Sequence, residues 1–214
     1  MKGLYMNIGF LASFITFSLI VYYNIKKQAR SGRKQEKSFW ARESRANSVR
    51  RKPLDGLVYI KIPLESFPTH LLNEDETVLE CIETMESLTS AKIVNLTGWS
   101  NTDLKLEYGA PNITALSEYD QNYTLLVRTL QKWADVLAEA GYRDEAVILM
   151  EFAISTNTDI SRTYYQLADY WAARGRADKI EQMMHTAQGL RSSNKDAILR
   201  HLKQSLDSII GVLY

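Results

Sequence analysis

The sequence predicts a mainly all-α protein that combines one N-terminal membrane-spanning helix with a helical domain. Residues 3–25 form a run of twenty-three residues without a charge. From about residue 119 onward, apolar residues recur at the spacing of amphipathic helices. The chain also divides by charge, because residues 26–52 hold eleven Lys/Arg against two acids, a net +9, whereas residues 53–214 carry a net −9. This division predicts a basic arm joined to an acidic domain.

Residues 1–25 predict a transmembrane anchor. The uncharged run of twenty-three residues spans about 34 Å as a helix at about 1.5 Å per residue, enough for a hydrocarbon core of about 30 Å. Tyr5 lies near one end, and Tyr22 with Tyr23 near the other, where aromatic residues anchor a helix at the two interfaces. A cleaved signal peptide is the alternative, but Lys2 is the one charge before the run and no small-residue cleavage site follows it.

The charges beside this run predict its orientation. Lys and Arg next to a membrane segment resist translocation, and the basic cluster follows the run while Lys2 stands alone before it. We therefore expect a single-pass protein with the N-terminus outside and the C-terminal domain in the cytoplasm. Asn95, Asn112 and Asn122 each begin an Asn-x-Thr glycosylation pattern, which favours a lumenal domain. Asn and Thr also favour turns and helix caps, so we interpret the three patterns as local structure.

Residues 26–52 predict a basic juxtamembrane linker that contacts the bilayer surface. Two aromatic residues interrupt the charges and suit a headgroup layer, and each basic residue near an anionic surface can contribute about 1 kcal/mol. A solvated stop-transfer linker is an equal alternative. Nucleic-acid binding is not expected, because the charge lies beside the membrane and the remainder is acidic. The residues expected at the membrane surface are Lys26, Lys27, Arg30, Arg33, Lys34, Phe39 and Trp40.

Residues 53–118 give mixed signals and are expected to form the N-terminal part of the folded domain. A short strand could form near residues 57–62, with prolines bounding the turn that follows. Residues 74–90 have helical spacing and acids in the first turn, which predicts a helix. Residues 102–108 could form another short helix.

Residues 119–191 repeat at an offset of 34 positions. In both copies of the repeat, apolar, small and acidic residues occupy corresponding positions. The aligned pairs are Leu130 with Tyr164, Trp133 with Leu167, Ala134 with Ala168, Leu137 with Trp171, Gly141 with Gly175, Asp144 with Asp178, Met150 with Met184, and Ala153 with Ala187.

A period of 34 with a glycine turn between two amphipathic helices resembles the tetratricopeptide repeat, over about residues 127–191. The chain departs from that pattern at Leu130 and Tyr164, where Trp is typical, and it lacks the terminal prolines. The resemblance implies two helical hairpins, with residues 192–214 forming a helix that caps the open apolar end. The alternative is a generic helical bundle whose register agrees by chance.

The resemblance also implies a binding groove, because these arrays hold a peptide or protein on the concave side formed by the first helix of each hairpin. Asp135 and Asp169 occupy positions where chaperone-binding members use asparagine to hold a C-terminal carboxylate. An acid there repels a carboxylate, so we expect a partner of basic or amphipathic character. The implied groove residues are Arg128, Gln131, Asp135, Glu139, Arg162, Tyr165 and Asp169.

Catalytic and metal-binding patterns are absent from the sequence. We find no glycine-rich phosphate loop, no Gly-x-Ser-x-Gly and no metal-spaced His/Cys group, and the single Cys81 cannot form an internal disulfide. We therefore expect no enzyme activity and no cofactor. The sequence favours a membrane-anchored adaptor or scaffold, and the alternative is a structural or regulatory subunit of a larger membrane complex with no groove of its own.

Overall fold

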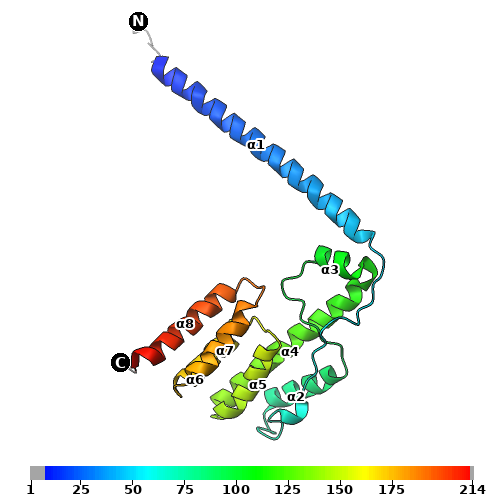
Figure 1. The fold of residues 1–214 in the computed structure, drawn as a ribbon, viewed down its shortest axis with the longest axis vertical. Coiled ribbons are helices and arrows are strands. Elements are labelled where there is room, and N and C mark those ends of the chain that lie inside the picture. Colours follow the sequence, from blue (N-terminus) through cyan, green and yellow to red (C-terminus); the bar gives the residue numbers. More distant parts are fainter. Residues whose placement is uncertain (1–7, 213–214) are drawn as a thin grey trace.

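The described part of the chain is all-α. A computed structural model describes residues 8–212, except for the side chains of residues 8–10, 29–31, 34 and 210–212. Figure 1 shows α1 projecting as a long rod from a domain in which the other helices pack together. The elements are α1 (Ile8–Asn47), η1 (Leu64–Ser66), α2 (Glu76–Thr89), α3 (Asn101–Tyr108), η2 (Ala110–Asn112), α4 (Ile113–Glu139), α5 (Arg143–Ser155), α6 (Ser161–Ala172), α7 (Ala177–Gln188) and α8 (Lys195–Val212).

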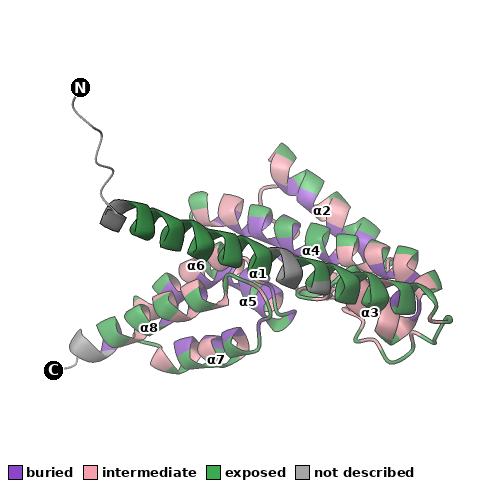
Figure 2. Ribbon diagram, turned by 90° about the horizontal axis from the view of Figure 1, so that it is seen from above, coloured by how far each residue is buried: buried purple, intermediate pink, exposed green. Residues whose placement is uncertain are grey.

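The helix α1 is continuous across the predicted boundary between anchor and linker. It has 40 residues, so its length is about 60 Å at about 1.5 Å per residue. Most of its side chains are exposed (Figure 2), and Ala46 near its end is fully buried. Among the described residues, no helix is long and apolar enough to cross a membrane. Residues 1–7, which the predicted anchor includes, lie outside the described residues.

The strand predicted near residues 57–62 does not form. No strand occurs in residues 8–212, and this segment has no regular structure. One main-chain bond joins it to the neighbouring loop, from the N–H of Ile60 to the carbonyl of Ile93 at 2.9 Å. A strand needs a ladder of such bonds, and the chain turns into η1 directly afterwards.

The two helices predicted before the repeat form as α2 and α3, each with a side-chain cap. Asp75 accepts a hydrogen bond from the N–H of Val78 at the start of α2. Ser100 and Asp103 form a reciprocal capping box at the start of α3. Such caps satisfy N–H groups that the first helical turn leaves without a partner, which fixes where each helix begins.

The two hairpins, α4–α5 and α6–α7, close with the same turn geometry. Gly141 follows α4 with φ 94°, and Gly175 follows α6 with φ 66°, a conformation that costs glycine little because it has no Cβ. In both turns the residue after the glycine donates its N–H to the carbonyl five residues earlier, at 2.8 Å and 3.0 Å. The two turns, 34 residues apart in the sequence, therefore share a positive-φ glycine and the same hydrogen-bond pattern.

The core follows α4, which contacts α2 on one side and α5 on the other. Figure 2 shows buried residues along this helix, which begins at Ile113, earlier than the predicted repeat. At the far end, α8 packs on α6 and α7, where the capping helix was expected. The largest fully buried side chains in the hairpins are Leu116, Leu126, Leu130, Trp133, Leu137, Leu149, Tyr164, Leu167 and Ile180.

Candidate functional site

Polar side chains of α4 and α6 form a network at the centre of the implied groove. The amide nitrogen of Gln131 donates to Oδ1 of Asp135 at 2.9 Å and to Oε1 of Gln166 at 2.7 Å. Its amide oxygen accepts from the Thr163 hydroxyl at 2.6 Å. Oδ1 of Asp135 also accepts from Nε of Arg162 at 3.0 Å and from Nε2 of Gln166 at 2.7 Å. One carboxylate oxygen therefore joins the two helices.

This network corrects the predicted place of Gln131. The side chain is buried and faces α6, because both ends of its amide are used between the helices, so it is not available on a groove surface. Asp135 is partly exposed, and its second oxygen, Oδ2, has no hydrogen-bond partner among the described residues. Oδ1 of Asp135 thus holds the two helices together, and Oδ2 remains available to accept a hydrogen bond from a bound protein.

The other implied groove residues surround the network. The ring of Tyr165 lies on His201 of α8, with centroids 4.0 Å apart, and Oδ1 of Asp169 is 3.8 Å from Nε2 of the same histidine. The side chains of Arg128 and Glu139 are exposed. Neither side chain forms a hydrogen bond or an ion pair with another described residue. We call this surface the α4/α6 face; its members are Arg128, Asp135, Glu139, Arg162, Tyr165 and Asp169.

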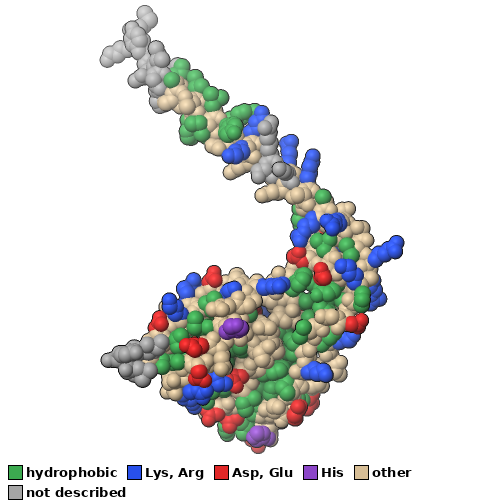
Figure 3. Space-filling model, viewed as in Figure 1, with side chains coloured by type: hydrophobic (Ala, Val, Ile, Leu, Met, Phe, Trp, Pro, Cys, Tyr) green, Lys and Arg blue, Asp and Glu red, His purple; other side chains and the backbone are tan. Residues whose placement is uncertain are grey.

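The apolar side chains of the predicted anchor are exposed around α1. Figure 3 shows hydrophobic side chains on the free part of this helix, followed by Lys and Arg toward the domain. The large hydrophobic residues, 39% to 66% exposed, are Leu11, Phe14, Ile15, Phe17, Leu19, Ile20, Val21, Tyr22, Tyr23 and Ile25.

The residues predicted at the membrane surface follow on the same helix. Lys26, Lys27 and Arg33 are exposed. Phe39 and Trp40 are exposed and contact each other edge to face, with ring centroids 5.5 Å apart. The side chains of two further members of this set, Arg30 and Lys34, lie outside the described residues.

The end of α1 is fixed to α3 by charged and polar contacts, which we call the α1–α3 joint. The carboxylate of Glu43 accepts from Nζ of Lys105 and from the Thr102 hydroxyl, the latter at 2.6 Å. These hydrogen bonds, that from Lys105 first, hold the pKa of Glu43 below its usual value. Arg42 donates to Oδ1 of Asp103 at 2.5 Å. The basic segment therefore ends in a fixed contact with the domain.

Asn112 secures the chain that leaves this joint. It is fully buried, and its amide nitrogen donates to the carbonyls of Lys52 and Tyr108, each at 2.7 Å. Its amide oxygen accepts from Nε of Arg51 at 2.9 Å. All the side-chain polar atoms of Asn112 are thus used to hold residues 51–52 against the end of α3.

The other two asparagines of the glycosylation patterns also use their amide nitrogens in the fold. Asn95 donates to two carbonyls of the α5–α6 turn, at 3.0 Å and 3.1 Å, and Asn122 donates to the carbonyl of Lys92 at 3.1 Å. Asn95 and Asn112 each donate two hydrogen bonds from the side-chain amide nitrogen. An N-linked glycan would replace one of the two amide hydrogens and so remove one of these bonds. These contacts give each pattern a local structural role.

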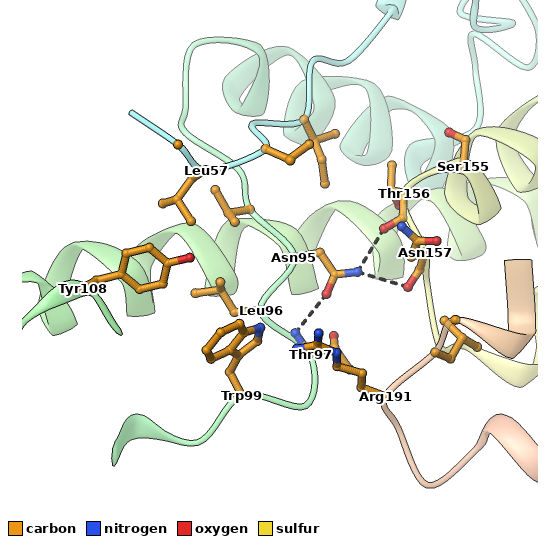
Figure 4. A pocket seen from close by; sticks show the side chains of 16 residues that line it. Leu57, Asn95, Leu96, Thr97, Trp99, Tyr108, Ser155, Thr156, Asn157 and Arg191 are labelled. Carbon is orange, nitrogen blue, oxygen red and sulfur yellow. Dashed lines mark hydrogen bonds between the residues drawn. The ribbon is translucent and has the colours of Figure 1, made fainter. Parts of the chain in front are cut away.

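An open cavity of about 590 Å³ lies where loops of the domain meet, and we call it the loop cavity. Its lining residues are Gly56, Leu57, Val58, Ile60, Val94, Asn95, Leu96, Thr97, Trp99, Tyr108, Ser155, Thr156, Asn157, Gly189, Leu190 and Arg191. Figure 4 shows Asn95 tying two of these walls together, and Trp99 and Arg191 at one side. The guanidinium carbon of Arg191 is 5.4 Å from the indole centroid.

Sequence reasoning did not predict the loop cavity, the role of Glu43 in the joint, or the contact of His201 with Tyr165. These contacts join segments far apart in the chain, so no local sequence pattern indicates them. Within the described residues, no three His, Cys, Asp or Glu side chains are grouped to hold a metal ion. Comparison of the chain with protein-family models, with curated proteins and with solved structures finds no match.

Proposed function

We propose that this chain is a membrane-anchored adaptor, in which α1 enters the bilayer and the helical domain binds another protein in the cytoplasm. The observation that carries the proposal is the exposure of ten large hydrophobic side chains on α1 between residues 11 and 25. An apolar helix surface of this extent needs lipid or protein around it, because contiguous exposed apolar surface is rare on soluble proteins. The proposal assigns the chain no catalytic role and no cofactor.

The proposed orientation rests on the charges that follow the apolar section. Residues 26–52 carry a net +9 and stay on the cytoplasmic side by the positive-inside rule. Lys26, Lys27, Arg30, Arg33 and Lys34 would then meet anionic lipid headgroups. The amide contacts of Asn95 and Asn112 support the same orientation, because a glycan on either one would remove a hydrogen bond of the fold.

The domain is proposed to be a divergent tetratricopeptide-like pair of hairpins capped by α8. Support comes from the 34-residue offset, which extends from the sequence to the turns at Gly141 and Gly175. We propose the α4/α6 face as the binding surface. Its acidic groups, Oδ2 of Asp135, the carboxylate of Glu139 and the exposed carboxylate of Asp169 beside His201, favour a basic or amphipathic partner.

A second candidate is a structural or regulatory subunit of a larger membrane complex. The observation in its favour is that several α4/α6 side chains are already engaged within the domain. Oδ1 of Asp135 accepts three hydrogen bonds, one of them from Arg162, and Tyr165 lies against His201. Much of this face is therefore used for packing.

Fractionation tests the anchor. The full chain should stay with membranes through high-salt and alkaline washing, and removal of residues 1–25 should release it. Protease protection should place the domain in the cytoplasm, with Asn95, Asn112 and Asn122 unmodified. A full-length chain recovered as a soluble, shortened species, or occupied glycosylation sites, would contradict the anchor or its orientation.

Partner capture distinguishes the two functions. The full chain, extracted from membranes in an uncharged detergent, serves as bait, because Arg42 and Glu43 form the α1–α3 joint and Asn112 holds residues 51–52 against the domain. Charge reversal at Glu139→Lys with Asp169→Lys should abolish capture by an adaptor, and Glu181→Lys on the exposed side of α7 is the matched control. Capture that withstands the double reversal, from a chain that aggregates without its partners, would favour the subunit.

A further inference from the structure

The loop cavity has the size and openness of a binding site. Its volume of about 590 Å³ lies within the range of about 300 to 1,000 Å³ typical of ligand pockets. It opens to solvent beside Val58, which is 83% exposed. The partly buried Leu57 and Ile60 and the buried Val94 and Leu96 give it an apolar floor.

The charge of the loop cavity is opposite to that of the domain around it. Residues 53–214 carry a net −9, yet none of the sixteen residues that line the cavity is an acid. Arg191 is exposed at its edge and forms no ion pair with a described residue; its guanidinium lies over Trp99. The cavity lining therefore offers a negatively charged group a cation and no acid, although Oδ1 of Asp120 contacts this lining by accepting a hydrogen bond from the N–H of Leu96 at 3.1 Å.

A main-chain group at the rim adds hydrogen-bonding capacity. The N–H of Val58, a lining residue, has no partner among the described residues. Peptide-binding sites commonly combine free main-chain donors and acceptors with pockets for alternate side chains. The combination of an apolar floor, an exposed arginine and an unpaired N–H group suits a peptide better than a bare anion.

The cavity walls are held in place before any ligand arrives. Asn95 ties residues 94–99 to the α5–α6 turn through two hydrogen bonds. Gly98 has φ +83°, and a Cβ added there would lie 2.5 Å from Cβ of Arg191, so the two loops are in close contact. Preorganised walls reduce the entropy that binding costs.

We infer that the loop cavity is a second binding site, which takes a partner segment with an apolar side chain next to an acidic one. The apolar side chain enters the floor formed by Leu57 and Leu96, and the acidic side chain pairs with Arg191. A main-chain carbonyl of the segment accepts a hydrogen bond from the free N–H of Val58. This site is separate from the α4/α6 face, which suits a basic partner.

Fluorine NMR on the full chain tests the site directly. The chain has four tryptophans, so labelling with 5-fluorotryptophan in uncharged detergent micelles gives one resonance for each, assigned with Trp→Phe variants. The probe is the capped peptide acetyl-Leu-Glu-Leu-Glu-amide, compared with the same peptide carrying Gln or Lys in place of Glu. The Glu peptide should shift the Trp99 resonance and leave that of the fully buried Trp133 unchanged.

Three variants test the chemistry. Arg191→Gln should weaken the Glu peptide about threefold to fivefold, as expected for one exposed ion pair, whereas Arg200→Gln, an exposed arginine on α8, should change nothing. Val58→Asp places an acid at the rim, so it should weaken the Glu peptide and strengthen the Lys peptide.

The inference would be overturned by equal responses to the Glu, Gln and Lys peptides, by no Trp99 shift at millimolar peptide, or by a response that Arg191→Gln leaves intact. A shift at Trp133 in place of Trp99 would overturn it as well. The inference does not depend on the proposed partner of the α4/α6 face. Glu139→Lys with Asp169→Lys should therefore leave the Trp99 response unchanged even if it abolishes capture.

Discussion

Replacing Asn112 by alanine tests how far the connection between α1 and the domain depends on one buried amide. The side chain makes three hydrogen bonds and is fully buried. A typical hydrogen bond contributes about 1 kcal/mol net, and a buried carbonyl left without a partner costs about 1–3 kcal/mol. The substitution leaves the carbonyl of Lys52 without its donor, whereas the carbonyl of Tyr108 still accepts from the N–H of Lys52 at 3.0 Å. We therefore expect Asn112→Ala to lower the free energy of unfolding by about 3 kcal/mol.

Asn122→Ala is the matched control, because Asn122 begins the same kind of sequence pattern but lies in a more exposed place. It donates one hydrogen bond, to the carbonyl of Lys92. Water can replace that bond when the amide is removed, so the loss should stay within about 0.5 kcal/mol, the scale of surface substitutions.

Urea unfolding of the full chain in uncharged detergent micelles, followed by circular dichroism and tryptophan fluorescence, measures both losses. Limited proteolysis gives a local readout, because loss of the Asn112 contacts should expose residues 48–53 to cleavage before the domain unfolds. Equal losses in the Asn112 and Asn122 variants would refute the reasoning. So would a large loss for Asn112→Ala without faster cleavage at residues 48–53.

Three further predictions follow from burial and charge. Trp133→Ala should cost about 3–5 kcal/mol in thermal unfolding because the side chain is fully buried, whereas Trp171→Ala, at a partly exposed position, should cost less than half as much; similar losses would contradict the assigned burial. Cys81 is buried, and burial raises the pKa of its thiol, so a maleimide should label it in step with urea unfolding and not before. Hydrogen bonds hold the pKa of Glu43 below its usual 4.5, so the α1–α3 joint should be intact above that pH and loosen as the pH falls through the lowered pKa. Cleavage at residues 48–53 measured against pH, with Glu43→Gln as the variant that should lose the acid transition, checks this.

The helical hairpins could be predicted from the sequence because their determinants are local and repeated. Gly141 and Gly175 stand at the same place in a 34-residue period, and each adopts the positive φ that ends its helix. The register predicts Trp133 and Trp171 inside; Trp133 is fully buried, whereas Trp171 is partly exposed. Because the pattern recurs within one chain, the second copy tests the register that is assigned to the first.

The segment near residues 57–62 shows why the strand prediction was wrong. Its run of β-branched, aromatic and apolar residues, interrupted by Lys61 alone, looks extended, but a strand also requires a neighbour with matching register. Residues 91–97 lie alongside, and one main-chain bond, from Ile60 to Ile93, joins the two segments. The local pattern was present and the partner ladder was not, so the chain follows an irregular path that forms a wall of the loop cavity.

Positions on the α4/α6 face could be assigned to a helix side, but their hydrogen-bond partners could not. Gln131 and Asp135 are one turn apart on α4, as predicted, yet their partners Thr163 and Gln166 come from α6. Which polar side chains meet across two helices depends on the crossing of those helices and on rotamers, neither of which the sequence displays. This is why a predicted groove residue, Gln131, lies inside the domain.

The continuity of α1 divides the predicted headgroup contacts into two groups. Trp40 is fifteen residues beyond Ile25, so an upright helix places it about 22 Å farther out at about 1.5 Å per residue. A headgroup layer adds about 5–8 Å on each side of the hydrocarbon core. In the proposed arrangement, Lys26 and Lys27 would lie at the surface of an upright helix, whereas Phe39 and Trp40 would reach it only with a strong tilt of α1. The α1–α3 joint would then carry the acidic domain toward the same anionic surface, which like charge opposes.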